Sequence, residues 1–220
     1  GILPIDTFGF FDPGFVILKG QIPIRDFWAY TGITVDYLQS LFFLLFGNNW
    51  NSYISHSSSI NVLASLIFYF FLLEIKISRL NSLIYTLSFA TLLYPVVGTP
   101  FAYLHAYVFS LMGIIVFAFS YHSKKYKLWI IIPVIFLISF LSMQTPTIYL
   151  IATLIPFIIF FTLKDKNTFM FNQLVIGTFI SLALLVLYLL ISKTNFKDFV
   201  YQYLLFPIMT LGSNHIKKST

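Results

Sequence analysis

Long apolar blocks separated by short polar stretches fill the chain from residue 57 onward. Six of these blocks are long enough to cross the hydrocarbon core of a bilayer, which takes about 17–25 apolar residues per helix. They lie near residues 57–75, 80–97, 101–121, 128–144, 146–163 and 171–192. Pro146 divides the fourth block from the fifth, and the connections are short, as between antiparallel neighbours. The pattern predicts an all-α fold, a polytopic transmembrane helix bundle.

The first 56 residues follow a different pattern, with short apolar stretches broken by Asp, Gly and Pro. The run over 33–46 is too short for a span, which predicts a juxtamembrane helix lying at the interface. The stretch over 199–211 is also apolar and short, and Pro207 interrupts it. The predicted organisation is an extracytoplasmic loop with a juxtamembrane helix over 1–56, a six-helix transmembrane region over 57–192, and an outer interfacial segment over 193–220.

The positions of Lys and Arg predict the orientation of these helices. Seven basic residues follow the first, third and fifth blocks: Lys76, Arg79, Lys124, Lys125, Lys127, Lys164 and Lys166. The alternate turns, around Thr99 and Thr145, contain none. Because basic loops stay in the cytoplasm, residues 1–56 are expected on the outer face of the cell (inner) membrane. Lys193 and Lys197 weaken this pattern, since they would lie outside.

Composition supports a membrane protein and excludes several other classes. Hydrophobic residues make up 59% of the 220, charged residues only 9%, and the mean hydropathy is +0.89. Soluble domains carry about 25% charged residues. The net charge of +6 comes from scattered basic residues rather than a patch, so no nucleic-acid partner is expected. The absence of cysteine excludes disulfides, zinc–thiolate sites and thiol catalysis.

Polar residues that could take part in catalysis or binding lie mainly on the predicted outer side. Asp12 and Asp26 lie in the first segment, and His56 lies at the start of the first block. His105 lies one turn into the third block, and Gln144 lies at the junction of the fourth and fifth. Charged and polar groups near a membrane are costly, which marks such a cluster as a candidate site. Each also has a structural interpretation. Asp12-Pro13-Gly14 is typical of a turn, and Asp26 beside Arg25 of a local ion pair. His105 and Gln144 would then only satisfy backbone groups.

Residues 11–47 resemble a known family. The matching residues are Asp12, Gly14, Leu18, Gly20, Pro23, Arg25, Asp26, Gly32 and Phe46-Gly47. This run is similar to the first outer loop of the GT-C-fold glycosyltransferases, polytopic membrane enzymes of the mannosyltransferase and arabinosyltransferase type that use polyprenyl-phosphate sugars. Pro13 stands where the family often has a second acidic residue, and Met143 where a lysine is common. The resemblance implies that the chain is an N-terminal fragment lacking a first helix and later ones.

The resemblance also implies an activity and roles for individual residues. It implies transfer of a sugar from a polyprenyl-phosphate donor to a glycan, lipid or protein acceptor in cell-envelope synthesis. Asp12 would be the catalytic base, with Asp26 as a second catalytic carboxylate. Arg25, His105 and Gln144 would bind the donor phosphate. Some relatives use a divalent cation, so Mg²⁺ or Mn²⁺ held by Asp12 and Asp26 stays open, although no metal site is predicted.

Three alternatives remain open at this stage. A transporter would place polar residues mid-membrane along a pathway, whereas the centres of these blocks are almost purely apolar. A lipid-linked polysaccharide polymerase or ligase is chemically close to the glycosyltransferase. A structural membrane subunit would have no site at all.

Overall fold

The structure is a computed structural model that describes residues 4–30, 32–93, 99–207 and 209. These residues form helices and one isolated bridge, between Pro23 and Phe27, and contain no strand. Four helices are long and apolar enough to cross a membrane: α3 (Trp50–Glu74), α5 (Ala102–His122), α7 (Gln144–Asp165) and α8 (Thr168–Ser192). The prediction of an all-α helical membrane bundle is confirmed.

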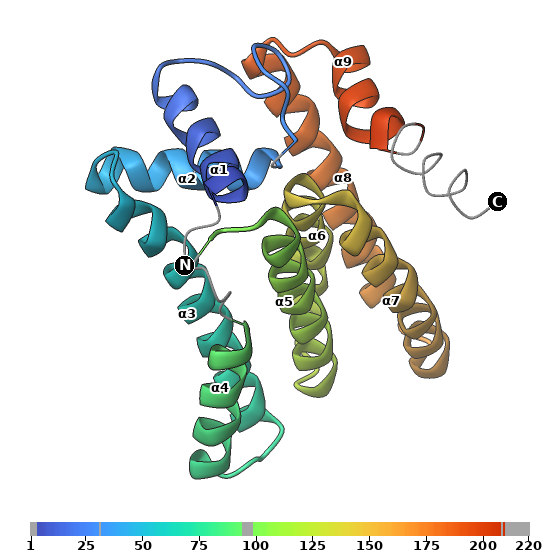
Figure 1. The fold of residues 1–220 in the computed structure, drawn as a ribbon. Helices are drawn as coiled ribbons and strands as arrows, with labels where there is room; N and C mark the ends of the chain where they lie inside the picture. The colour runs from blue at the N-terminus through green and yellow to red at the C-terminus, as the bar shows by residue number, and fades with distance from the viewer. Residues whose placement is uncertain (1–3, 31, 94–98, 208, 210–220) are drawn as a thin grey trace, which may run out of the picture.

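Two shorter helices run beside the four long ones. They are α4 (Arg79–Leu93) and α6 (Ile131–Ser142), which the 3₁₀ turn η1 (Tyr126–Ile130) precedes. They fall on the predicted blocks 80–97 and 128–144, of which residues 94–97 lie outside the described residues. α4 packs mainly against α3, so these two helices form a hairpin beside the bundle of α5 to α8 (Figure 1).

Helix boundaries differ from the hydropathy pattern where capping decides them. α3 begins at Trp50 because the side chain of Asn49 accepts a hydrogen bond from the Ser52 N–H at 3.0 Å. The predicted boundary after residue 56 therefore lies inside a helix. α6 and α7 are divided by Met143, whose backbone is extended, and not by Pro146. Pro146 lies in the first turn of α7, where its missing N–H costs nothing.

A helix, α1 (Pro4–Leu18), replaces the turn that Asp12-Pro13-Gly14 suggested. Pro13 has no N–H to donate to the carbonyl of Gly9 four residues earlier, and such a loss usually breaks a helix. Here the hydroxyl of Tyr30 donates to the Gly9 carbonyl at 3.2 Å. A residue from outside the helix thus supplies the hydrogen bond that proline removes, and the turn interpretation of Asp12 is wrong.

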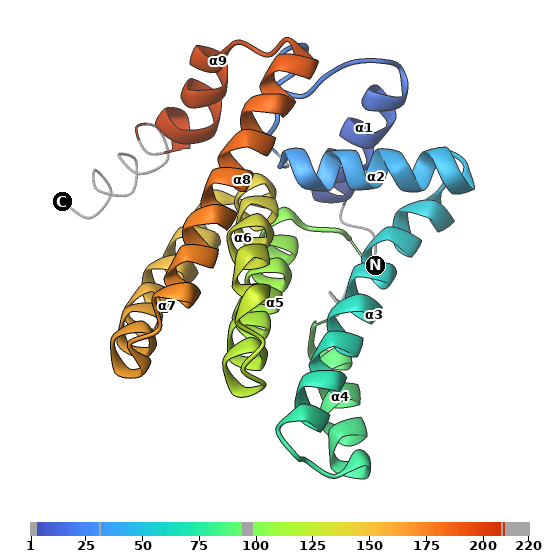
Figure 2. The same cartoon turned by 180° about the vertical axis from the view of Figure 1, so that it is seen from behind.

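α2 (Ile33–Phe46) lies across one end of the bundle, with the bounds that the sequence predicted (Figures 1 and 2). α3, α5 and α7 begin at this end, and α9 (Phe196–Val200) with the π-helix η2 (Tyr201–Leu205) lies there too. Gly32 contacts the end of α6 so closely that an added Cβ would lie 2.0 Å from the Ser142 carbonyl oxygen. The hydroxyl of Thr34 donates to the carbonyl of Ile138 at 3.0 Å. These contacts attach α2 to α6.

A lysine with a left-handed backbone follows each of the four long helices. Their φ angles are 69° at Lys76, 55° at Lys124, 48° at Lys166 and 53° at Lys193. In each case the N–H of the next residue donates to a carbonyl five residues earlier: Ile77 to Leu72, Lys125 to Ser120, Asn167 to Thr162, and Thr194 to Leu189. This is the Schellman arrangement, in which glycine is the usual residue.

The contact between Gly32 and α6 predicts a loss of stability on substitution. Gly20 and Gly32 have φ of 88° and 90°, but nothing lies within 4 Å of a Cβ built on Gly20. Gly20→Ala should therefore cost about 1 kcal/mol for the backbone alone. Gly32→Ala should cost about 2–3 kcal/mol more because the methyl group meets the Ser142 carbonyl. Thermal unfolding in detergent measures both; equal losses would contradict the close contact.

Candidate functional site

A buried chain of hydrogen bonds joins α2, α3 and α5 below the crossing helix. The side-chain oxygen of Gln39, Oε1, lies 2.9 Å from Nδ1 of His56. Nε2 of His56 lies 3.2 Å from Nε2 of His105, whose Nδ1 lies 2.9 Å from the carbonyl oxygen of Phe101. The exposed fractions of Gln39, His56 and His105 are 0%, 0% and 1%. Buried hydrogen bonds between polar side chains therefore connect α2, α3 and α5.

The proton positions in this chain of hydrogen bonds follow from its last acceptor, the carbonyl oxygen of Phe101. The Phe101 carbonyl can only accept, so Nδ1 of His105 carries a proton and its Nε2 is an acceptor in the neutral ring. Nε2 of His56 must then donate, which leaves Nδ1 of His56 to accept from the amide nitrogen of Gln39. The oxygen and nitrogen of an amide are interchangeable in shape. With the nitrogen toward His56, every bond in the chain has one donor and one acceptor, and both rings are neutral.

A second polar junction joins α5, α6 and α7 one turn further along α5. The hydroxyl of Ser139 donates to the Ala106 carbonyl at 2.7 Å and lies 2.7 Å from the hydroxyls of both Ser110 and Thr147. Thr147 fixes the first turn of α7, where Gln144 is half-buried. The side chain of Gln144 makes no hydrogen bond to another described residue, so its amide is available to a ligand.

Asp12 is exposed on α1, at the same end of the bundle. Partial burial, followed by the negative charges of Asp36 and Asp12, raises the pKa of Tyr30. Tyr30 therefore lies within electrostatic reach of both carboxylates and stays a neutral phenol. Asp36 is fully buried on α2. Gly14, half a turn beyond Asp12, packs directly against Gln39, so that a Cβ there would lie 2.6 Å from the Gln39 Cγ.

Arg25 and Asp26 engage each other rather than an open site. Nε and Nη2 of Arg25 donate to the two carboxylate oxygens of Asp26 at 2.9 and 2.8 Å. Nη1 donates to the carbonyl of Ser192 at the end of α8, at 3.0 Å. The hydrogen bonds from Arg25, followed by the N–H of Ile22, lower the pKa of Asp26. Asp26 thus closes a turn, and Arg25 attaches that turn to α8.

The five predicted site residues consequently fall into separate environments. Asp12 is exposed, His105 is enclosed in the buried chain, Gln144 begins α7, and Arg25 and Asp26 form an ion pair. Both carboxylate oxygens of Asp26 are occupied by Arg25. Among the described residues, no group of three or more His, Cys, Asp or Glu side chains could hold a metal ion.

Sequence reasoning gave no site role to three polar residues that the structure buries, Asp36, Gln39 and His56. A signal was present for the first two. The buried residues of α2 include Ile33, Asp36, Ser40 and Phe43 at helical spacing, with Gln39 beside them. Polar residues therefore occupy the face that is expected to be apolar. The sequence places His56 with the outer polar residues, at the start of the first block, but does not show that its ring meets His105.

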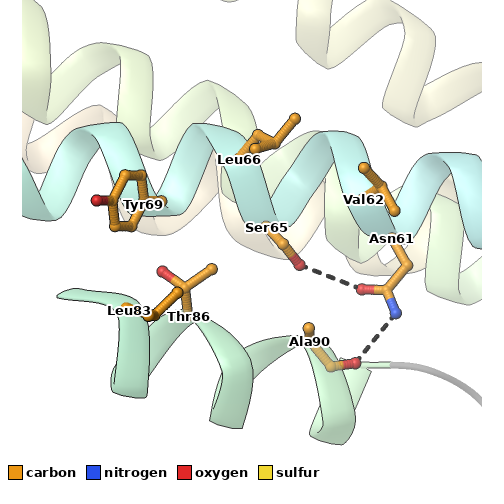
Figure 3. Close-up of a pocket in the computed structure, with 8 residues that line it drawn as sticks. All are labelled: Asn61, Val62, Ser65, Leu66, Tyr69, Leu83, Thr86 and Ala90. Carbon is orange, nitrogen blue, oxygen red and sulfur yellow. Dashed lines mark hydrogen bonds between the residues drawn. The ribbon is translucent and has the colours of Figure 1, made fainter. Parts of the chain in front are cut away.

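A separate groove between α3 and α4 contains polar groups away from either end (Figure 3). The amide of Asn61 donates to the Ala90 carbonyl at 3.0 Å, and Ser65 donates to Asn61 at 3.4 Å. The groove has a volume of about 300 Å³, and apolar side chains such as Val62, Leu66 and Leu83 supply most of its surface. Asn61 acts here as an interhelical clamp, as polar residues do between membrane helices.

Comparison of the chain with known proteins does not assign it to a family. No protein-family model matches the chain, and no match is found among curated proteins or among solved structures.

The neutral chain of Gln39, His56 and His105 predicts coupled losses of stability. His105→Phe should cost about 1–3 kcal/mol because the Nε2–H of His56 would be buried without an acceptor. The double variant His56→Phe/His105→Phe should lose much less stability than the sum of the two single variants, because the unpaired donor of His56 is absent from it. Thermal unfolding at pH 7 measures the cycle, with the exposed His122→Gln as a control within about 0.5 kcal/mol. Additive losses would show that the two rings do not interact.

Proposed function

We propose that this chain is part of an integral, multi-pass membrane glycosyltransferase that takes its sugar from a polyprenyl phosphate. The acceptor is a glycan, lipid or protein of the cell envelope, and the reaction takes place on the extracytoplasmic face of the cell (inner) membrane. The observation that carries the proposal is the exposed carboxylate of Asp12 on α1, a helix that packs through Gly14 against Gln39 of the buried chain. The resemblance of residues 11–47 supports the same assignment.

Asp12 acts as the general base in this proposal. Its carboxylate accepts the proton of the acceptor hydroxyl as that oxygen forms a bond to the anomeric carbon. The bond from the anomeric carbon to the phosphate oxygen breaks at the same time, and the phosphate leaves with the bonding electrons. One carboxylate suffices for an inverting displacement, because the base and the leaving group lie on opposite faces of the sugar. Exposure keeps Asp12 accessible to an acceptor.

Gln144 is the residue best placed to bind the leaving phosphate among the three predicted for that role. Its amide is free of hydrogen bonds to described residues and lies at the N-terminus of α7, where the helix dipole favours negative charge. His105 is enclosed in the buried chain, so its role is to position α5 against α3. Arg25 and Asp26 shape the loop between α1 and α2 and would need to separate before either could contact a substrate. A divalent cation, Mg²⁺ or Mn²⁺, is not part of this scheme.

The arrangement of polar groups favours this proposal over a transporter. A translocation path would require polar groups in succession from one end of the bundle to the other. The buried chain, the serine–threonine junction and Asp12 instead lie toward the end where α2 crosses. The Asn61 clamp between α3 and α4 is isolated from them. A lipid-linked polysaccharide polymerase or ligase would use the same carboxylate and differs in its acceptor.

Substitution of Asp12 tests the chemistry. In the full-length protein, Asp12→Asn should reduce sugar transfer by about 10²–10⁴-fold, the usual contribution of a general base. Expression and thermal stability should not change, because the side chain is exposed. Asp26→Asn, measured in parallel, should lower stability more than transfer per folded molecule. Transfer near the wild-type rate in Asp12→Asn would refute the role of Asp12.

Single-cysteine labelling tests the orientation independently of activity. The chain has no cysteine, so Gln21→Cys and Ser78→Cys each introduce one reactive thiol at an exposed position. In intact cells, a membrane-impermeant maleimide should modify position 21 and should modify position 78 only after lysis. The reverse pattern would place Asp12 in the cytoplasm and exclude an extracytoplasmic reaction, even if Asp12 proved essential.

A further inference from the structure

A polar cavity lies at the end of the bundle opposite α2. It is formed where α5 ends, where η1 begins and where α7 connects to α8 (Figure 1). Its volume is about 560 Å³. The residues that line it are Tyr121, His122, Lys124, Tyr126, Asp165 and Asn167. None of them belongs to the candidate site above, and the proposed function does not use them.

The cavity is lined by a positive and a negative side chain that are not paired with each other. Lys124 and Asp165 both line it, yet neither forms a salt bridge within the part of the chain that the structure describes. The carboxylate of Asp165 lies within reach of the Tyr121 hydroxyl, and His122 is within electrostatic reach of Glu74 on α3. A cationic region and an anionic region therefore face one space, an arrangement complementary to a dipolar ligand.

The left-handed backbone at Lys124 fixes the direction in which its side chain leaves the main chain. Lys124 follows α5 with φ of 55°, and the N–H of Lys125 closes the end of the helix onto the Ser120 carbonyl at 2.9 Å. The cation is consequently presented by a closed helix end rather than by a free loop. Asn167 is similarly fixed, because its side chain caps α8 by accepting from the N–H of Phe169 at 3.0 Å.

The helices that meet at the cavity expose apolar side chains near it. Exposed apolar side chains flank it on α7 and α8, among them Phe160, Leu163 and Phe169. The ammonium of Lys164 lies 5.9 Å from the centre of the Phe160 ring, which keeps its charge beside an apolar surface. A ligand with a charged head and apolar chains would contact both regions, whereas a soluble metabolite would leave the apolar rim uncovered.

We propose that this cavity binds the headgroup of an aminophospholipid, with the lipid phosphate on Lys124 and the primary ammonium on Asp165. The carboxylate of Asp165 and the amide oxygen of Asn167 accept hydrogen bonds, which a primary ammonium can donate and a quaternary one cannot. The rings of Tyr121 and Tyr126 add an attraction for the cation. The site is independent of the glycosyl-transfer proposal.

Native mass spectrometry of the purified, delipidated protein tests this site. The probe is an equimolar mixture of phosphatidylethanolamine, phosphatidylcholine and phosphatidylglycerol with identical acyl chains. Phosphatidylethanolamine should be retained about fivefold more than either of the others, the ratio expected for one additional ionic contact. Asp165→Asn should reduce its retention to that of phosphatidylglycerol. Lys124→Gln should reduce the retention of both phosphatidylethanolamine and phosphatidylglycerol.

Lys166→Gln is the matched control, because Lys166 is also a left-handed lysine at the same end but does not line the cavity. It should retain the wild-type preference. Competition on the wild-type protein by phosphoethanolamine, but not by glycerol 3-phosphate, tests the headgroup without any substitution that could impair folding. Equal retention of phosphatidylglycerol or phosphatidylcholine, or an unchanged preference in Asp165→Asn, would overturn the proposal.

Discussion

The structure of one end of the bundle depends on α2, which lies across the ends of the other helices. A helix that lies across its neighbours meets them over short stretches, so each contact must be specific. Gly14 allows α1 to approach Gln39, and Gly32 allows α2 to approach the last carbonyl of α6. Gln39 then reaches down to His56 and thereby to α5. A change in the angle of α2 would break contacts with α1, α3 and α6 together.

The helices from α3 to α8 were predictable because bilayer thickness imposes a length on each apolar block, whereas α1 was not. Their ends were not, since ends are set by single side chains that hydropathy does not register. Asn49 moves the start of α3 seven residues ahead of the predicted block, and Met143 rather than Pro146 divides α6 from α7. The juxtamembrane helix over 33–46 was predicted with correct bounds because glycines flank it on both sides, at Gly32 and Gly47.

The candidate site was only partly predictable, because a sequence shows which residues are polar and not which of them meet. Arg25 and Asp26 carried the most evident charges of the outer loop, and the structure pairs them with each other. Gln39 and His56 carried weak signals, yet they form the buried contacts that join three helices. Tyr30, which restores the hydrogen bond lost at Pro13, acts across 21 positions of sequence, a relation that no local pattern contains.

The lysines that follow α3, α5, α7 and α8 have a consequence for reading topology from charge. A lysine at such a position ends a helix and faces its negative dipole, so local geometry alone is a reason for its presence. Lys193, which together with Lys197 departs from the charge bias, is one of these. Setting all four aside removes Lys76, Lys124 and Lys166 from the basic side but leaves Arg79, Lys125, Lys127 and Lys164. The charge bias that remains is smaller, but it no longer includes lysines whose position can be explained by helix termination alone.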